Sequence, residues 1–207
     1  FLLLQMDTGH DPTAEICDNQ VDDTGNGRVD CDDESCERTM ICREEIPGKV
    51  DVFVMSECPF ALKGLSAMEK VLEAFQGELS FNVHYVATKD GDGFKALHGQ
   101  SEVDENIRQL CAARHDPAGT KYMEYIWCRN KNIRSKEWEP CAEEAGMTVD
   151  TISTCAKGAE GKELLSEDIK IGHALGITAS PTWLANNKHK FSGIDARTIQ
   201  TNICKHN

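Results

Sequence analysis

The sequence lacks the features by which several large classes of protein are recognised. It has no run of about 20 consecutive apolar residues, so no segment has the composition of a membrane-spanning helix. Basic residues are few, 22 against 35 acidic ones, and the net charge of −13 argues against a nucleic-acid phosphate backbone as the main partner. A glycine-rich phosphate loop, a Gly-x-Ser-x-Gly turn and a His-Glu-x-x-His helix are absent, and so is any Asn-x-Ser/Thr acceptor. The sequence therefore gives no support for a phosphate-loop nucleotide-binding protein, a hydrolase with such a serine turn, a zinc protease or an N-glycosylated protein.

What is present is typical of a folded domain with a small appendage. Apolar residues make up 40% of the 207 residues and charged residues 28%, as in globular proteins with a buried core. Residues 1–46 contain 13 acidic but only three basic residues, a net charge of −10, which leaves −3 for residues 47–207. We therefore predict an acidic module in residues 1–46 and a larger domain in residues 47–207, with the boundary near Ile46-Pro47-Gly48.

Cysteine is unusually frequent. Ten cysteines are spread along the chain, at positions 17, 31, 36, 42, 58, 111, 128, 141, 155 and 204. This density favours an oxidising compartment, in which disulfides persist, and we predict an exported protein, periplasmic or extracellular. The initial Phe1-Leu2-Leu3-Leu4 is interpreted either as the remnant of a signal peptide or as the start of a cropped sequence.

The acidic module contains a loop with the ligand spacing of an EF-hand. Gly27 stands where such a loop turns sharply, and oxygen ligands are expected from the Arg28 carbonyl and from five side chains: Asp22, Thr24, Asn26, Asp30 and Asp33. Thr24 replaces an acid and Asp33 replaces the longer Glu, so the expected affinity is low. Without a cation the clustered carboxylates repel one another. We predict a Ca²⁺ site; the alternative is a solvated acidic turn.

Four cysteines bracket this loop, at positions 17, 31, 36 and 42. The stretch from Glu15 to Cys31 resembles short Cys-rich, Asp/Gly-rich repeats on exported bacterial proteins. A segment of this size buries too little apolar surface to fold alone, so disulfides and an ion would replace a core. The three possible pairings of these cysteines stay open.

The larger domain begins with a strand, a tight turn and a helix. Lys49–Met55 reads as a buried strand, and apolar residues then recur at helical spacing from Leu62 to Phe75. Pro59 suits the first turn of that helix, which places Cys58 at its N-terminus. The partial positive charge there favours a thiolate over a thiol, so we predict that Cys58 is a nucleophile; the alternative is an inert buried thiol.

Further patterns complete a resemblance to a known fold. A second strand is predicted at Leu79–Val86, and Ile177–Ala185 contains Ser180-Pro181-Thr182 ahead of another strand pair and a last helix from about Asp195. Together with the Cys58-Pro59 turn, this order resembles the thioredoxin fold, an α/β fold whose central mixed sheet is flanked by helices. The helical, Cys-containing segment at about residues 100–165 is similar to the insertion of the DsbA-like thiol-disulfide oxidoreductases, and its cysteines also resemble those of lysosomal thiol reductases.

The resemblance implies a site and a partner. It implies that Pro181 follows a cis peptide bond and lies against Cys58, and that Ser180 and Thr182 frame a groove for an extended client peptide. Pro59 and Phe60 would contact the client beside the thiol. The expected partners are protein or peptide clients that contain cysteine, and the redox chemistry needs no cofactor.

One departure from the family bears directly on activity. The family pattern is Cys-x-x-Cys, whereas this chain reads Cys58-Pro59-Phe60-Ala61 and lacks the resolving thiol. A lone Cys58 forms a mixed disulfide that another thiol must release. Three interpretations stay open: a monothiol exchanger or isomerase, an engineered Cys-to-Ala trap, and a non-catalytic peptide-binding module with a calcium-stabilised connector. A metal carrier that uses Cys58 and Met55 is disfavoured, because one thiolate makes a poor site.

Cysteine parity predicts which sulfurs remain free. Four cysteines of the acidic module and four of the insertion can pair within their own segments, which leaves Cys58 and Cys204. The spacings from Cys128 to Cys141 and from Cys141 to Cys155 suit bridges between adjacent helices and not a zinc site. A cross-link from Cys204 to either segment is the alternative.

Overall fold

The computed structural model describes residues 14–37, 39–116 and 118–206. The chain forms two units, residues 1–44 and 45–207, which are described separately. The predicted boundary after residue 46 lies two residues further along the chain. The interpretation of Phe1–Leu4 falls outside the described residues. No helix in the described part of the chain combines the length and hydrophobicity needed to cross a membrane.

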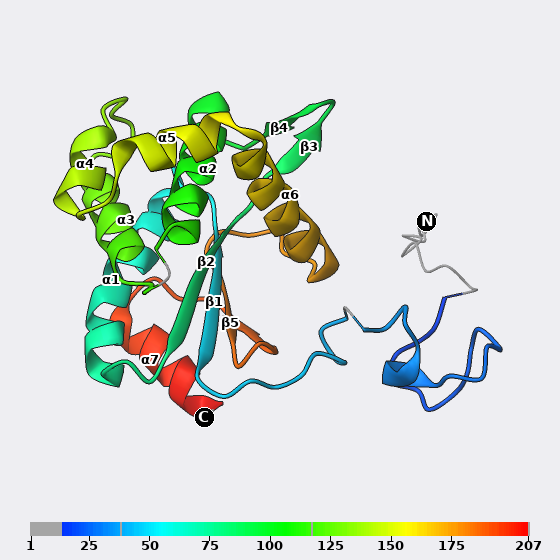
Figure 1. Cartoon of the computed structure of the whole chain (residues 1–207). Coiled ribbons are helices and arrows are strands. Elements are labelled where there is room, and N and C mark those ends of the chain that lie inside the picture. The colour runs from blue at the N-terminus through cyan, green and yellow to red at the C-terminus, as the bar shows by residue number, and fades with distance from the viewer. Residues whose placement is uncertain (1–13, 38, 117, 207) are drawn as a thin grey trace, which may run out of the picture. The chain divides into compact units, whose positions relative to one another are not determined.

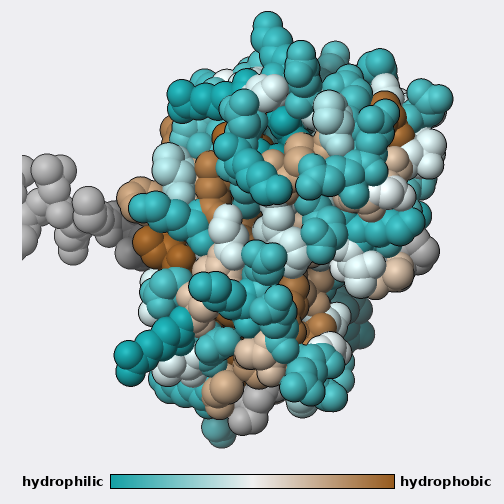
Figure 2. Space-filling model, turned by 90° about the vertical axis from the view of Figure 1, so that its left-hand side faces the viewer, coloured by the Kyte–Doolittle hydropathy of each residue, from teal (hydrophilic) through white to brown (hydrophobic). Residues whose placement is uncertain are grey.

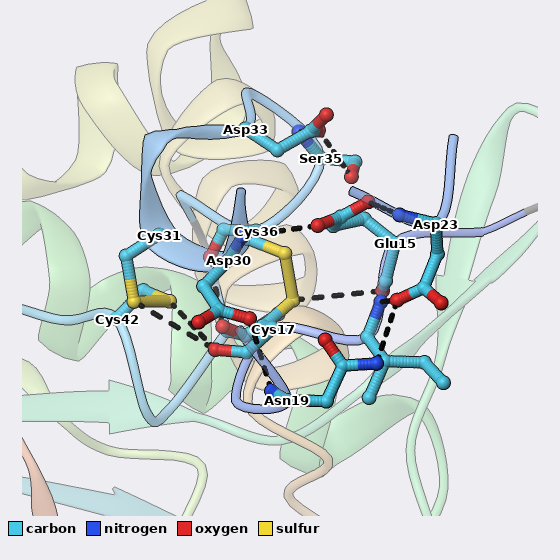
Figure 3. The surroundings of a disulfide bond; sticks show 12 residues. Glu15, Cys17, Asn19, Asp23, Asp30, Cys31, Asp33, Ser35, Cys36 and Cys42 are labelled. Carbon is cyan, nitrogen blue, oxygen red and sulfur yellow. Dashed lines mark hydrogen bonds between the residues drawn. A yellow bond between two sulfur atoms is a disulfide. The ribbon is translucent and has the colours of Figure 1, made fainter. Parts of the chain in front are cut away.

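The first unit is held by disulfides more than by secondary structure. In its described residues the only regular element is a short 3-10 helix, η1 (Asp30–Asp32). Two disulfides join Cys17 to Cys36 and Cys31 to Cys42. Figure 3 shows the two bridges beside each other, with acidic side chains around them. Cys36 is fully buried, so the first bridge takes the place that a packed side chain would hold in a larger core.

The second unit is built on a mixed four-stranded sheet. Its strands follow the order β2-β1-β5-β6, and the bounds are β1 (Lys49–Val54), β2 (Ser80–Tyr85), β5 (Thr182–Ala185) and β6 (His189–Phe191). β1 pairs parallel with β2 and antiparallel with β5, and β5 pairs antiparallel with β6. Because β1 lies inside the sheet with helices on both faces, residues 50–54 are all buried, including Asp51 among the four apolar residues.

In the described residues, seven α-helices pack on or beside this sheet. They are α1 (Pro59–Phe75), α2 (Gln100–Arg114), α3 (Lys121–Lys131), α4 (Glu139–Glu144), α5 (Val149–Lys157), α6 (Ala159–Ala174) and α7 (Ala196–Lys205). Figure 1 shows α1 and α7 on one side of the sheet and α6 on the other, with α2 to α5 gathered beyond one end of it. A small hairpin of β3 (Thr88–Asp90) and β4 (Gly93–Lys95) was not predicted, because its six residues are short, polar and mostly exposed.

The insertion is tied together by two disulfides and by a buried ion pair between Arg129 on α3 and Glu105 on α2 (3.0 Å). Cys111 on α2 bonds to Cys155 on α5, and Cys128 on α3 bonds to Cys141 on α4. The predicted end near residue 165 falls inside α6, which continues without a break from the insertion to the sheet. The free cysteines of the described residues are Cys58, which is buried, and Cys204, which is exposed. The structure thus has the predicted parity, and Cys204 is not cross-linked to either segment.

Candidate functional site

Cys58 occupies the position between the first strand and the first helix. It is the N-cap residue of α1, and Pro59 is the first residue of that helix. The Cys58 amide donates to the carbonyl of Met55 (3.0 Å), and the Leu62 amide donates to the carbonyl of Cys58 (3.0 Å). The thiol therefore lies at the N-terminus of a helix of 17 residues, the positive end of its dipole. Only 8% of the residue is exposed.

A second chain segment lies against this thiol. The Ser180-Pro181 peptide bond is cis, as the resemblance implies. The Cys58 Sγ donates to the carbonyl oxygen of Ser180 at 3.5 Å, although 122 residues separate the two in sequence. The contact follows from the sheet, because β5 starts directly after Pro181 and pairs with β1 so that Thr182 lies opposite Phe53. Sheet pairing thus brings together Cys58 and Pro181.

The other predicted client contacts have different surroundings. Pro59 and Phe60 are exposed, and 58% of Phe60 is accessible beside the thiol. The Ser180 hydroxyl accepts a hydrogen bond from the Met55 amide (2.8 Å), so this side chain braces the turn that carries Cys58. The Thr182 hydroxyl donates to the Ala179 carbonyl (2.8 Å) and fixes the loop ahead of β5.

In the described residues, the Cys58 turn contains no second free thiol that could resolve a mixed disulfide on Cys58. Ala61 occupies the position of the missing thiol and is fully buried in the first turn of α1. The eight paired cysteines are in disulfides, and Cys204, the other free cysteine of the described residues, lies near the end of α7. Chemistry at Cys58 that turns over therefore needs a thiol from outside this turn.

The sequence interpretation missed the contribution of the insertion to this site. The Ser56 amide donates to Asn106 Oδ1 on α2 (3.3 Å), and the Ser56 hydroxyl donates to the carbonyl of Glu102 (3.5 Å). Asn106 and Glu102 are both fully buried. The sequence did contain a signal for this. Glu102 and Asn106 stand next to Val103 and Ile107, the apolar positions of α2, so they lie near the buried face of that helix.

In the first unit, four of the predicted calcium ligands converge. The Asp22 carboxylate accepts from the backbone amides of residues 25 (2.6 Å), 26 (3.1 Å) and 27 (2.7 Å), and these bonds, led by that of Gly27, lower the pKa of Asp22. Asn26 Nδ2 and Thr24 Oγ1 both donate to Asp33 Oδ2, at 2.6 and 3.5 Å. Hydrogen bonds from Ser35, and then from Asn26, lower the pKa of Asp33 to about 2. Both carboxylates are therefore ionised at neutral pH.

The other two predicted ligands have separate contacts. The Asp30 carboxylate accepts from the amides of Asn19 (3.0 Å) and Gln20 (3.0 Å). For Arg28 the predicted ligand is the backbone carbonyl, and the side chain pairs with Glu34 (2.7 Å). Figure 3 shows Asp30 directed at Asn19, away from Asp33. Four of the predicted side chains thus lie as a calcium loop requires, and the Asp30 side chain does not.

Glu15 is the acidic side chain of this unit that the sequence interpretation missed. One oxygen of its carboxylate accepts from the amides of Asp23 (3.0 Å) and Thr24 (3.3 Å), and the other accepts from the Asp30 amide (3.0 Å). Elsewhere in the described residues one group of metal-ligand side chains clusters, His115, Cys155 and Glu160, but its Cys155 sulfur is bonded to Cys111.

Comparison with known proteins agrees with this architecture. Residues 49–145, just under half of the chain, match the family described as gamma interferon inducible lysosomal thiol reductase (GILT). The match contains Cys58, Ala61 and three of the four insertion cysteines, and it ends before Pro181. Among curated proteins, no sequence matches.

Solved structures extend the likeness to most of the second unit. BdbD from Bacillus subtilis, in its oxidised form, is 16% identical in sequence and superposes with a TM-score of 0.62. The alignment covers 79% of this chain and 89% of BdbD. ScsC from Proteus mirabilis is 12% identical with a TM-score of 0.60, covering 79% and 69%. A periplasmic thioredoxin-like protein from Salmonella enterica serovar Typhimurium is 13% identical with a TM-score of 0.58, covering 79% and 86%. At these identities the likeness shows the fold, and the predicted thioredoxin fold with its helical insertion is confirmed; the chain is similar to a thiol reductase family and to thioredoxin-fold oxidoreductases.

Proposed function

We propose that this chain exchanges disulfides with protein clients through Cys58. The observation that carries the proposal is the contact of the Cys58 Sγ with the Ser180 carbonyl, beside a cis proline and at the N-terminus of α1. The similarity of residues 49–145 to a thiol reductase family supports it. The oxidoreductase neighbours in fold support the same chemical class.

The exchange step needs only sulfur chemistry. The Cys58 thiolate attacks one sulfur of a client disulfide, a new bond forms between Cys58 and that sulfur, and the other client sulfur leaves as a thiolate. A second thiol, from the client or from a small molecule, then attacks the mixed disulfide and releases the Cys58 thiolate. Because Ala61 has no sulfur, net reduction of a client must be supplied by that second thiol, and net oxidation of a client needs a small-molecule disulfide as the electron acceptor. Reshuffling of disulfides within one client needs no further reagent.

The backbone beside Cys58 is suited to hold the client. In the resting thiol, the Ser180 carbonyl accepts from Sγ. When the thiolate forms, that donor is lost and the carbonyl is available to a backbone amide of an extended client segment. The client cysteine would then be held next to Sγ, in position for in-line attack.

An oxidising compartment is part of the proposal. Four disulfides in one chain persist where thiols are not kept reduced, which supports a periplasmic or extracellular location. One neighbour in fold is itself described as periplasmic.

Trapping a mixed disulfide tests the function. The chain is incubated with a protein that contains a strained or non-native disulfide, quenched with acid and separated without reductant. We expect a Cys58-dependent adduct that Cys58→Ser abolishes and Cys204→Ser leaves intact. Refolding of scrambled ribonuclease with glutathione then measures turnover, and Ala61→Cys should add insulin reduction with dithiothreitol.

A non-catalytic binding module is the competing function, and the buried Ala61 is the observation that favours it. The same experiment decides between the two. If neither the chain as given nor Ala61→Cys forms the adduct or turns over, the result would favour a module that binds clients without disulfide exchange.

We also propose that Ca²⁺ stabilises the first unit through the loop from Asp22 to Asp33. The convergence of Thr24 and Asn26 on Asp33 supports it. Asp30 would have to exchange its contacts with the Asn19 and Gln20 amides for the ion, which is consistent with a weak site.

A further inference from the structure

A shallow groove runs along the helix that begins at Cys58. It has a volume of about 630 Å³ and lies between α1 and the segment that leads into α7. Its apolar walls are Leu62, Ala67 and Ile194, and 37% of Ile194 is exposed. We call it the α1–α7 groove. On the face drawn in Figure 2, which is the left-hand side of Figure 1, hydrophobic side chains appear as separate patches among hydrophilic ones.

The groove starts next to the reactive position. Leu62, at its near end, donates its amide to the carbonyl of Cys58, so one turn of α1 separates the two. Phe60, 58% exposed, lies within that turn. A client segment whose cysteine is at Cys58 therefore places its neighbouring residues over Phe60 and along the groove.

The charges that line the groove are of the opposite sign to the protein as a whole. Lys63 and Lys70 line it and are exposed, and neither has an acidic partner within 4 Å in the described residues. They are seven residues apart on α1, roughly 10 Å along the same face of the helix. The one acidic lining residue, Asp195, caps α7: its carboxylate accepts from the Thr198 amide (3.0 Å) and hydroxyl (2.7 Å). These bonds hold the Asp195 carboxylate at the N-terminus of α7, and the two lysines outnumber this one acidic side chain in the lining of the groove.

We propose that the α1–α7 groove selects client segments that combine an apolar side chain with acidic residues. The inference rests on the proposed exchange at Cys58 and names the class of client that it prefers. The net charge of −13 opposes this only at long range, because at physiological ionic strength charges more than about 8 Å apart are largely screened. Within the groove, a bound client meets two lysines and one aspartate, so the local balance favours acidic residues.

Two model peptides test the inference. Each contains one cysteine, followed by a leucine three residues later, and the cysteine carries a thionitrobenzoate leaving group whose release is followed by absorbance. One peptide has glutamates and the other lysines at the flanking positions. We expect the chain as given to release thionitrobenzoate from the acidic peptide about three- to tenfold faster, as two exposed ion pairs allow, and the ratio to fall toward one in high salt.

Matched charge variants locate the preference. Lys63→Glu/Lys70→Glu should reverse it, whereas Lys89→Glu/Lys95→Glu, exposed lysines on the β3–β4 hairpin, change the net charge equally and should leave it intact. A ratio that is the same in both double variants, or a basic-peptide preference in the chain as given, overturns the inference but not the exchange. Release from neither peptide, at any salt concentration, overturns the proposed function itself. Should the groove variant not fold, Lys63→Gln/Lys70→Gln takes its place and should bring the ratio close to one, with Lys89→Gln/Lys95→Gln as its control; an unchanged ratio overturns the inference.

Discussion

The amide of Ser56 donates a hydrogen bond to the side-chain oxygen of Asn106 at 3.3 Å, and this bond joins the turn that carries Cys58 to the helical insertion. On its other side the same turn is held by Ser180, whose hydroxyl accepts from the Met55 amide. The thiol is thus clamped between the sheet and α2. An insertion that braces the Cys58 turn restricts it more than the strand and helix alone would.

Replacing Asn106 tests this brace. In Asn106→Leu the Ser56 amide loses its acceptor in a buried place, which we expect to lower the free energy of unfolding by about 1–3 kcal/mol. The Ser56 amide should also exchange its hydrogen faster, and alkylation of Cys58 should change in rate because its turn is less restrained. Urea denaturation, amide hydrogen exchange and alkylation kinetics measure the three effects.

Asn130 provides the matched control. Its side-chain nitrogen and oxygen are both buried without a hydrogen-bond partner, so Asn130→Leu removes two unsatisfied polar atoms and breaks no bond. We expect its stability to be equal to or greater than that of the unmodified chain. An equal loss in both variants would show that the Ser56 bond has no special role.

Protonated His84 stabilises the folded protein, and we expect this contribution to the unfolding free energy to be lost at alkaline pH. Its ring lies 2.7 Å from Asp168 and 3.7 Å from Asp51, which also pairs with Lys49. Burial would lower the pKa of His84, but the hydrogen bonds to Asp168 and Asp51 outweigh it and raise the pKa from 6.5 to about 9. A raised folded-state pKa contributes stability that is complete below about pH 6.5 and is lost as the pH rises through about 9.

His84→Gln should remove this dependence. Between pH 6 and pH 10 the unmodified chain is expected to lose roughly 3 kcal/mol more unfolding free energy than the variant. Titration of lysines and tyrosines is common to both proteins and cancels in the comparison. Parallel curves of unfolding free energy against pH would contradict the prediction.

The two insertion disulfides should contribute unequally. Cys111 and Cys155 enclose a separation of 44 residues, whereas Cys128 and Cys141 enclose 13. By loop-closure entropy the first bridge contributes about 4 kcal/mol and the second about 3 kcal/mol. The first is also the more buried, so Cys111→Ala/Cys155→Ala should be the less stable double variant in urea denaturation. The reverse order of stability would mean that loop-closure entropy in the unfolded chain does not decide how much each disulfide contributes to the unfolding free energy.

Calcium should raise the melting temperature of the first unit within the full chain. EDTA should lower it, and added Ca²⁺ should restore it, because the Asp22 and Asp33 carboxylates no longer repel each other. Asp22→Asn should abolish the response, whereas Glu37→Gln, the same change of charge outside the loop, should keep it. Differential scanning calorimetry measures it, and a melting curve that is the same in EDTA and Ca²⁺ removes the ion from the proposal.

Several features were predictable because they depend on neighbouring residues. The apolar run at Lys49–Val54, the Pro59 turn and the helical spacing after it place Cys58 at a helix N-terminus without reference to the rest of the chain. The parity of the cysteines likewise left Cys58 and Cys204 free. Of the two spacings that suited bridges, that from Cys128 to Cys141 is bridged, whereas Cys141 is not bonded to Cys155.

Other features depended on distant parts of the chain. The bridge from Cys111 to Cys155 is set by the packing of α2 against α5, which the spacing alone does not show. Asp30 has the spacing of a calcium ligand, yet its carboxylate is directed to the Asn19 and Gln20 amides. Asn106 acquires its role only because α2 passes behind the Cys58 turn.

By itself, then, the amino-acid sequence determined the local elements, the position of the Cys58 sulfur at the start of a helix and the absence of a second thiol at Ala61. Only the tertiary structure decided what faces that sulfur. The Ser180 carbonyl lies 3.5 Å from Sγ because β5 pairs with β1 and because α2 closes the other side. Periodicity and capping act over a few residues, whereas such contacts depend on how complete elements pack, and no short stretch of sequence contains that information.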